Sequence, residues 1–243
     1  MKQVIITAAF IITAALVFRL LFYKCDTSIN TAAEPDYAIV ENLNGLGCIR
    51  IGETHDQIAA ALDSCYIAYR KLRSSHDMID HARVKRDNML KYVGPRSTDT
   101  PDEYNKDYRR YYATLIVSEE LAANQVELYF WRDTLHKIVL NNGITNTRDF
   151  AEAMIWKHGS GKGYHNKKAG IESQLHKWGS DRCVATYQGK TEYILNSEGL
   201  ANGVRSWYHF IEIKLNDTDM QRRIDAYLHE ADSLWAADTY GGI

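Results

Sequence analysis

The sequence predicts an α+β fold in which an N-terminal transmembrane helix precedes antiparallel sheets with packed helices. Three observations carry this prediction: a long apolar stretch near the start, alternating strand patterns later in the chain, and amphipathic helical stripes between them. The predicted elements follow the order helix, three strands, helix, three strands, helix. This order indicates two tandem helix-then-three-strand units.

The apolar stretch covers residues 4–23 and is interrupted by Arg19. It is long enough to span a bilayer if Arg19 extends its guanidinium toward the lipid headgroups. A cleaved signal peptide is the alternative, because the uncharged run before Arg19 also has a suitable length, although no small-x-small triplet directly follows it. Cys25 is a poor lipidation site, because the large side chain of Lys24 precedes it.

We therefore expect a single-pass membrane protein whose C-terminal region is periplasmic or otherwise extracytoplasmic. The very short tail before the apolar stretch favours this orientation. The predicted organisation is a membrane anchor or signal segment at 1–24, a polar tether at 25–45, a first α+β unit at 46–142 and a second at 143–243.

The first unit begins with a helix that Thr54 caps, because Gln57 stands at the spacing of a capping box. The apolar stripe of this helix comprises Ile58, Leu62, Cys65, Tyr69 and Leu72. A strand over residues 65–72 is the alternative interpretation, because short apolar patterns fit both periods.

Two further helices and three strands complete the first unit. The helices are predicted from Ser74 or Ser75 to Tyr92, and from Thr100 through Tyr104, Tyr108 and Tyr111. The strands are predicted at 114–118, 126–131 and 135–140, the last two forming a hairpin. The basic segment from Arg70 to Arg110 also contains several aspartates, so we expect a solvated helical surface there.

The second unit has the same order of elements. Helices are predicted at 147–158, closed by Gly159, and around Ile171, Leu175 and Trp178. Strands are predicted at 182–187 and 191–195, a hairpin around Gly189 and Lys190, and at 207–215. The last helix begins with a capping box of Thr218 and Gln221, and its stripe comprises Met220, Ile224, Leu228, Ala231 and Trp235.

Residues 46–58 carry a family resemblance. A short apolar run, Gly52 and a capping Thr54 precede an amphipathic helix, which resembles the opening of small bacterial envelope modules. These modules are the helix-plus-antiparallel-sheet type of outer-membrane assembly lipoproteins and the beta-lactamase inhibitory protein type, which has two such units. Residues 130–138 are similar to the hairpin of these modules. The resemblance implies a non-enzymatic protein-binding module and transfers no binding residue.

No catalytic, cofactor-binding or metal-binding motif emerges from the sequence. The Gly159–Gly163 segment lacks the spacing of a phosphate loop, so we expect a flexible loop. Two zinc-like pairs, His76 with Asp80 and Asp77 with His81, lie on neighbouring helical faces without a third ligand and are expected on a solvated face. Cys183 lies in an alternating pattern and is expected in the core.

The composition favours an ordinary folded protein without a basic excess. The net charge is -2, which gives no indication of nucleic-acid binding. We expect a membrane-tethered, exported protein-binding or assembly module of the bacterial envelope, with an inhibitor or immunity protein as a special case. The alternatives are a hydrolase that uses His158, His165 and His176, and a lipid-facing structural protein that uses the Arg70–Arg110 segment.

A disulfide between Cys48 and Cys65 is the remaining candidate site. The four cysteines allow three complete pairings, and an exported domain permits disulfides. If the apolar run at residues 46–51 turns at Gly52 and packs antiparallel to the following helix, Cys48 returns beside Cys65. Two reduced, buried thiols are the alternative.

Overall fold

The computed structural model describes residues 35–73, 89–94, 100–117, 121–141 and 147–240. The chain divides into Met1–Asp36 and Tyr37–Ile243, and the fold below is that of the second unit. Among the described residues, no helix combines the length and apolar character needed to cross a bilayer. The predicted membrane segment at 4–23, Cys25 and the zinc-like pairs of residues 76–81 lie outside the described residues.

Three helices and eleven strands make up the described structure. The helices are α2 (His55–Arg73), α3 (Thr147–His158) and α4 (Thr218–Tyr240). The strands are β1 (Ala38–Ile39), β2 (Gly45–Leu46), β3 (Ile49–Arg50), β4 (Leu90–Gly94), β5 (Tyr108–Ile116), β6 (Ala122–Trp131), β7 (Thr134–Leu140), β8 (Lys162–Lys168), β9 (Ile171–Gly179), β10 (Cys183–Leu195) and β11 (Ala201–Leu215).

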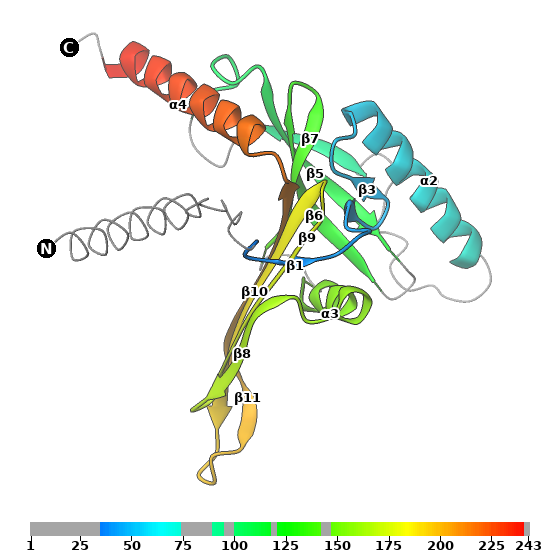
Figure 1. Cartoon of the computed structure of the whole chain (residues 1–243), viewed down its shortest axis with the longest axis vertical. Helices are drawn as coiled ribbons and strands as arrows, with labels where there is room; N and C mark the ends of the chain where they lie inside the picture. Colours follow the sequence, from blue (N-terminus) through cyan, green and yellow to red (C-terminus); the bar gives the residue numbers. More distant parts are fainter. Residues whose placement is uncertain (1–34, 74–88, 95–99, 118–120, 142–146, 241–243) are drawn as a thin grey trace, which may run out of the picture. The chain divides into compact units, whose positions relative to one another are not determined.

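Nine of these strands form one continuous sheet (Figure 1). Its order is β1-β9-β10-β11-β7-β6-β5-β4, with β8 also paired to β9, while β2 and β3 form a separate hairpin. β1 runs parallel to β9, and the other pairs of the large sheet are antiparallel. The sheet is therefore mixed.

The predicted fold class is wrong. Two tandem helix-then-three-strand units would give two separate sheets, but β11 pairs with β7 from Ile211–Leu140 to Lys214–Lys137 and joins both halves into one sheet. The predicted transmembrane helix has no counterpart in the described residues. The end of the predicted tether also belongs to the sheet unit, because β1 pairs with β9 and Leu43 is buried.

Helices pack against both faces of the sheet (Figure 1). Leu128 and Phe130 of β6 share the main core with residues of α2 and α3, such as Ile58 and Phe150. Successive strand residues point to opposite faces. Accordingly, Tyr129 and Trp131 of β6 lie on the other face and pack with Ile224 and Leu228 of α4.

The ends of β8–β11 extend beyond α3 as two long hairpins (Figure 1). Residues 163–168 of β8 and 201–208 of β11 are exposed, whereas the second half of β11 alternates buried and half-buried side chains. This part of the sheet therefore lacks a helical cover among the described elements and presents its side chains to solvent.

Several predicted helices are strands in the structure. The helical spacing of Ile171, Leu175 and Trp178 belongs to β9, and the helix from Thr100 gives way to turns followed by β5. The predicted hairpin around Gly189 is also wrong, because β10 runs straight through it. Within the Arg70–Arg110 segment, the described residues after α2 form β4, turns and β5, so the predicted helical surface is wrong there.

Other predictions are confirmed. Thr54 and Gln57 form the capping box, with the Thr54 amide donating to Gln57 Oε1 at 2.9 Å. α3 covers the predicted residues and ends at Gly159, whose φ is 77°. The β6–β7 hairpin turns at Arg132 and Asp133, both with positive φ. The last helix exists, but Asp217 caps it, accepting from the Met220 amide at 2.9 Å.

Candidate functional site

Five aromatic and imidazole rings stack across three neighbouring strands on the face of the sheet beside α3. They are Trp178 and His176 from β9, Tyr187 from β10, and His209 and Trp207 from β11, with successive centroids 5.8 to 6.1 Å apart. Strand register explains this alignment, because His176 lies opposite Tyr187, and Gly189, two residues after Tyr187, lies opposite His209. The ring series runs from fully buried Trp178 to half-exposed Trp207.

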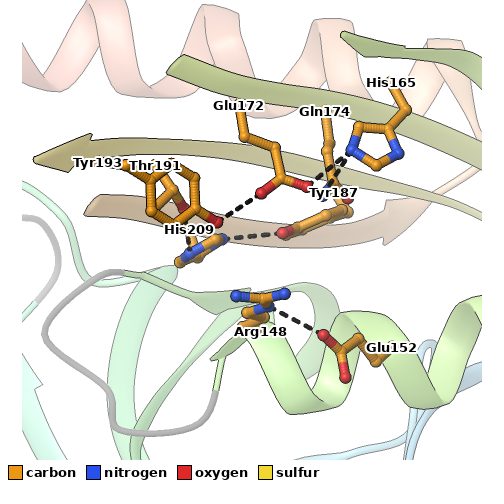
Figure 2. Close-up of polar contacts among 9 residues, drawn as sticks. All are labelled: Arg148, Glu152, His165, Glu172, Gln174, Tyr187, Thr191, Tyr193 and His209. Atoms are coloured by element: carbon orange, nitrogen blue, oxygen red, sulfur yellow. Dashed lines mark hydrogen bonds and ion pairs between the residues drawn. The ribbon is translucent and has the colours of Figure 1, made fainter. Parts of the chain in front are cut away.

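Gly189 leaves the space in which Tyr187 meets His209. A Cβ atom at Gly189 would lie 2.3 Å from the Tyr187 hydroxyl oxygen. That hydroxyl lies 2.8 Å from His209 Nδ1 (Figure 2). Burial raises the pKa of Tyr187 to about 12 and lowers the pKa of His209, so the phenol and the imidazole are both neutral near pH 7 and share one hydrogen bond. The other ring nitrogen, His209 Nε2, faces Thr191 Oγ1 at 3.5 Å.

Glu172 is the centre of a second polar group on the same face. Its carboxylate accepts from Tyr193 Oη at 2.6 Å and from Gln174 Nε2 at 3.0 Å, and His165 Nε2 lies 2.7 Å away (Figure 2). The hydrogen bond from Tyr193 is the main reason that the pKa of Glu172 falls to about 2. Glu172 is therefore ionised at neutral pH and fixes the orientation of three neighbouring side chains.

Arg148 brings a positive charge from the first turn of α3 to these strands. Its Nε lies 2.9 Å from Glu152 Oε1, one helical turn further along, and this hydrogen bond raises the pKa of Arg148 (Figure 2). The charge of Arg148 adds to the effect of burial in lowering the pKa of His209, and it partly opposes the rise that burial causes in the pKa of Tyr187. The site thus combines two anionic and one cationic group with stacked rings.

The three histidines of the hydrolase hypothesis occupy different surroundings. His165 is exposed beside Glu172, and His158 lines a cavity at the end of α3. His176 is buried between Trp178 and Tyr187, and its Nδ1 hydrogen-bonds the Ser160 carbonyl. In the part of the chain that the structure describes, no group of three histidine, cysteine or acidic side chains could hold a metal ion.

The Gly159–Gly163 segment is a structural connection between α3 and β8. Trp178 Nε1 donates to the Gly159 carbonyl at 2.8 Å. Gly161 lies against the Lys177 carbonyl and the Trp178 ring, where a Cβ would approach within 3.0 Å. The predicted flexible loop is therefore shorter than expected, because β8 begins at Lys162.

The predicted disulfide partners lie against each other. The thiols of Cys48, beside β3, and Cys65, in α2, are in hydrogen-bonding contact, and both cysteines are free. Burial and this contact raise the pKa of Cys48 to about 12. Cys183 is fully buried in the core, as predicted, and its thiol lies 3.3 Å from the Leu43 carbonyl.

Sequence reasoning missed most residues of the site, namely Arg148, Glu152, Glu172, Gln174, Tyr187, Thr191 and Tyr193. A signal was present in the two-residue period of polar and aromatic side chains. Glu172, Gln174 and His176 alternate along β9, and Tyr187, Gly189, Thr191 and Tyr193 alternate along β10. The helix and hairpin predictions for these segments concealed that pattern.

Comparison with protein-family models, with curated proteins and with solved structures finds no match to this chain. The resemblance of residues 46–58 and 130–138 to small envelope modules therefore stays a prediction.

Proposed function

We propose that this protein is a non-catalytic protein-binding module whose partner docks on the α3 side of the β10–β11 hairpin. The binding surface comprises Arg148, Tyr193, Leu195, Val204 and Trp207, and we call it the β10–β11 surface. Arginine, tyrosine and tryptophan are the residues that most often dominate the binding energy of protein interfaces. Trp207 is 49% exposed although it is large and apolar, and this observation carries the proposal.

Strand pairing places apolar residues next to this tryptophan. Tyr193 pairs with Val204, so the two side chains share a face, and Leu195 follows two residues after Tyr193 on β10. Leu195 and Val204 are exposed. Contiguous exposed apolar side chains bordered by charges are typical of interaction sites in soluble domains.

Hydrogen bonds and stacking hold this surface in place before a partner binds. Tyr193 is fixed by Glu172, Arg148 by Glu152, and Trp207 stacks on His209. Ordering a free side chain at an interface costs roughly 0.5–1.5 kcal/mol. Side chains that are already ordered avoid much of this cost, which supports recognition of a partner by a preformed surface.

We further propose that residues 4–23 attach the protein to a membrane and that the sheet unit lies outside the cytoplasm. Support for this comes from the sequence, since these residues lie outside the described part of the structure. Intact-mass analysis of the native protein tests membrane attachment by an uncleaved segment. A mature N-terminus after Tyr23 would contradict it.

The hydrolase and lipid-facing hypotheses remain predictions that no specific observation favours. Metal analysis of purified protein tests the first, and salt-dependent liposome binding tests the second.

A pull-down from native membranes tests the proposed function. Tyr208 provides a matched control, because it is 45% exposed, adjacent to Trp207 and directed to the opposite face of β11. We expect tagged wild-type protein and the Tyr208→Ala variant to capture the same stoichiometric partner. Trp207→Ala should lose it, and equal capture by both variants would contradict the proposal.

A further inference from the structure

A cavity of about 450 Å³ lies between α2, α3, the β2–β3 hairpin and the adjoining ends of β5 and β6. This volume falls in the range of small-molecule binding sites, roughly 300–1,000 Å³. Its apolar lining comprises Leu43, Leu46, Ile116, Val117, Leu121, Phe150 and Met154. The cavity is separate from the β10–β11 surface and shares no residue with it.

Among the described residues, the charged side chains that line this cavity have one sign. Arg50 and Lys157 are cationic, and no acidic side chain belongs to the lining among the described residues. His158 also lines the cavity, and burial and the neighbouring Lys157 lower its pKa, so it is neutral near pH 7. The described part of the lining is therefore apolar with a cationic border.

We propose that this cavity binds an apolar chain that carries a carboxylate, such as a medium-chain fatty carboxylate. The alkyl chain lies between the side chains of α3 and those of Ile116, Val117 and Leu121, where it leaves water. The carboxylate lies beside Lys157, which is exposed on α3 and can meet the anion without burying it. Charge complementarity thus selects a carboxylate over a neutral or cationic head group.

The two thiols provide a local readout, because Cys48 and Cys65 line the cavity and Cys183 does not. The experiment measures alkylation rates of each cysteine by peptide mass spectrometry, on reduced full-length protein with increasing decanoate or dodecanoate. We expect saturable protection of Cys48 and Cys65, whereas Cys183 is fully buried and should not react with or without the ligand. Dodecanoate should protect at a concentration roughly tenfold lower than decanoate, because it has two more methylene groups and each buried methylene contributes about 0.8 kcal/mol to binding.

Two substitutions and their controls locate the ligand. Ala153 is exposed on α3 and lines the cavity, so Ala153→Phe fills it without entering the core, whereas Ala226→Phe adds the same ring to the exposed side of α4. Ala153→Phe should abolish protection, and Ala226→Phe should leave it unchanged. Lys157→Glu should raise the half-protecting concentration roughly fivefold, and Lys168→Glu on β8 should not.

The proposal is overturned if protection does not saturate, or if Ala153→Phe protects as well as wild type. Equal protection by decanol and decanoate would also overturn it, because the cationic border would then play no part in recognition.

Discussion

Gly189 determines how Tyr187 lies on the sheet. In the middle of a long strand glycine is unfavourable, because it lacks a side chain to pack and costs backbone entropy. Here its missing side chain allows the Tyr187 ring to lie across β10 and reach His209. The contact between Tyr187 and His209 in the ring series depends on this one residue.

Gly189→Ala should therefore destabilise the protein by about 1–3 kcal/mol, because the new methyl group displaces the Tyr187 hydroxyl. Gly203→Ala is the control, since a Cβ there has its nearest neighbour at 3.6 Å. Urea unfolding measures both. Equal stability of the two variants would show that Tyr187 does not need this space.

His136 should make the protein sensitive to mild acid. It is buried beside Tyr108, and burial followed by the charge of Lys137 lowers its pKa from 6.5 to about 3. Below pH 6.5 this histidine binds a proton in the unfolded chain but not in the folded protein, so the free energy of unfolding decreases as the pH is lowered, down to about pH 3. Between pH 7 and pH 5 this histidine should lower the free energy of unfolding by about 2 kcal/mol.

The variant His136→Phe keeps a ring beside Tyr108 and removes the titrating group. The loss of unfolding free energy between pH 7 and pH 5 should be about 2 kcal/mol smaller than in wild type. An unchanged pH dependence would mean that His136 titrates with the same pKa in the folded and unfolded states.

At the scale of elements, the β2–β3 hairpin folds back on α2. Ile49 and Ile51 are buried, and Cys48 between the two strands faces Cys65 in the helix. This is the arrangement that the turn at Gly52 and the apolar stripe of the helix predicted. The bond itself stays a prediction, because both thiols are free in the structure.

In an oxidising compartment Cys48 and Cys65 should form a disulfide. The bond should stabilise the protein by about 3 kcal/mol, because it closes a loop and so lowers the conformational entropy of the unfolded chain. Thiol alkylation of unreduced, denatured protein from its native location tests this. We expect both cysteines to resist alkylation until a reductant is added. Complete alkylation without reductant would contradict the bond.

Local signals predicted the elements that local chemistry determines. The capping box at Thr54, the helix closed by Gly159 and the turn at Arg132 and Asp133 depend on residues that are adjacent in sequence. β9 and β10 depend on pairing with other strands, namely with each other, with β8 and with β11, and β9 also pairs with the distant β1. Their apolar residues also fit a helical spacing or a hairpin, and only the pairing of strands decides between these alternatives.

At the scale of the whole molecule, one face of the large sheet carries both the main core and the β10–β11 surface. The face beside α2 and α3 contains the main core and continues, past α3, into the β10–β11 surface. The junction between β11 and β7 makes this continuity possible, and no sequence pattern indicated it, because it joins strands about 70 residues apart. The continuous sheet could therefore not be assembled from the sequence.

The central claim is that a partner protein contacts the α3 side of β11. Site-specific photo-crosslinking in intact cells tests this most directly, with a photoreactive phenylalanine placed at Trp207 or, as the control, at Tyr208. We predict one discrete crosslinked product from position 207 and none of that mass from position 208. A product of equal yield from position 208, or none from position 207, would contradict the account.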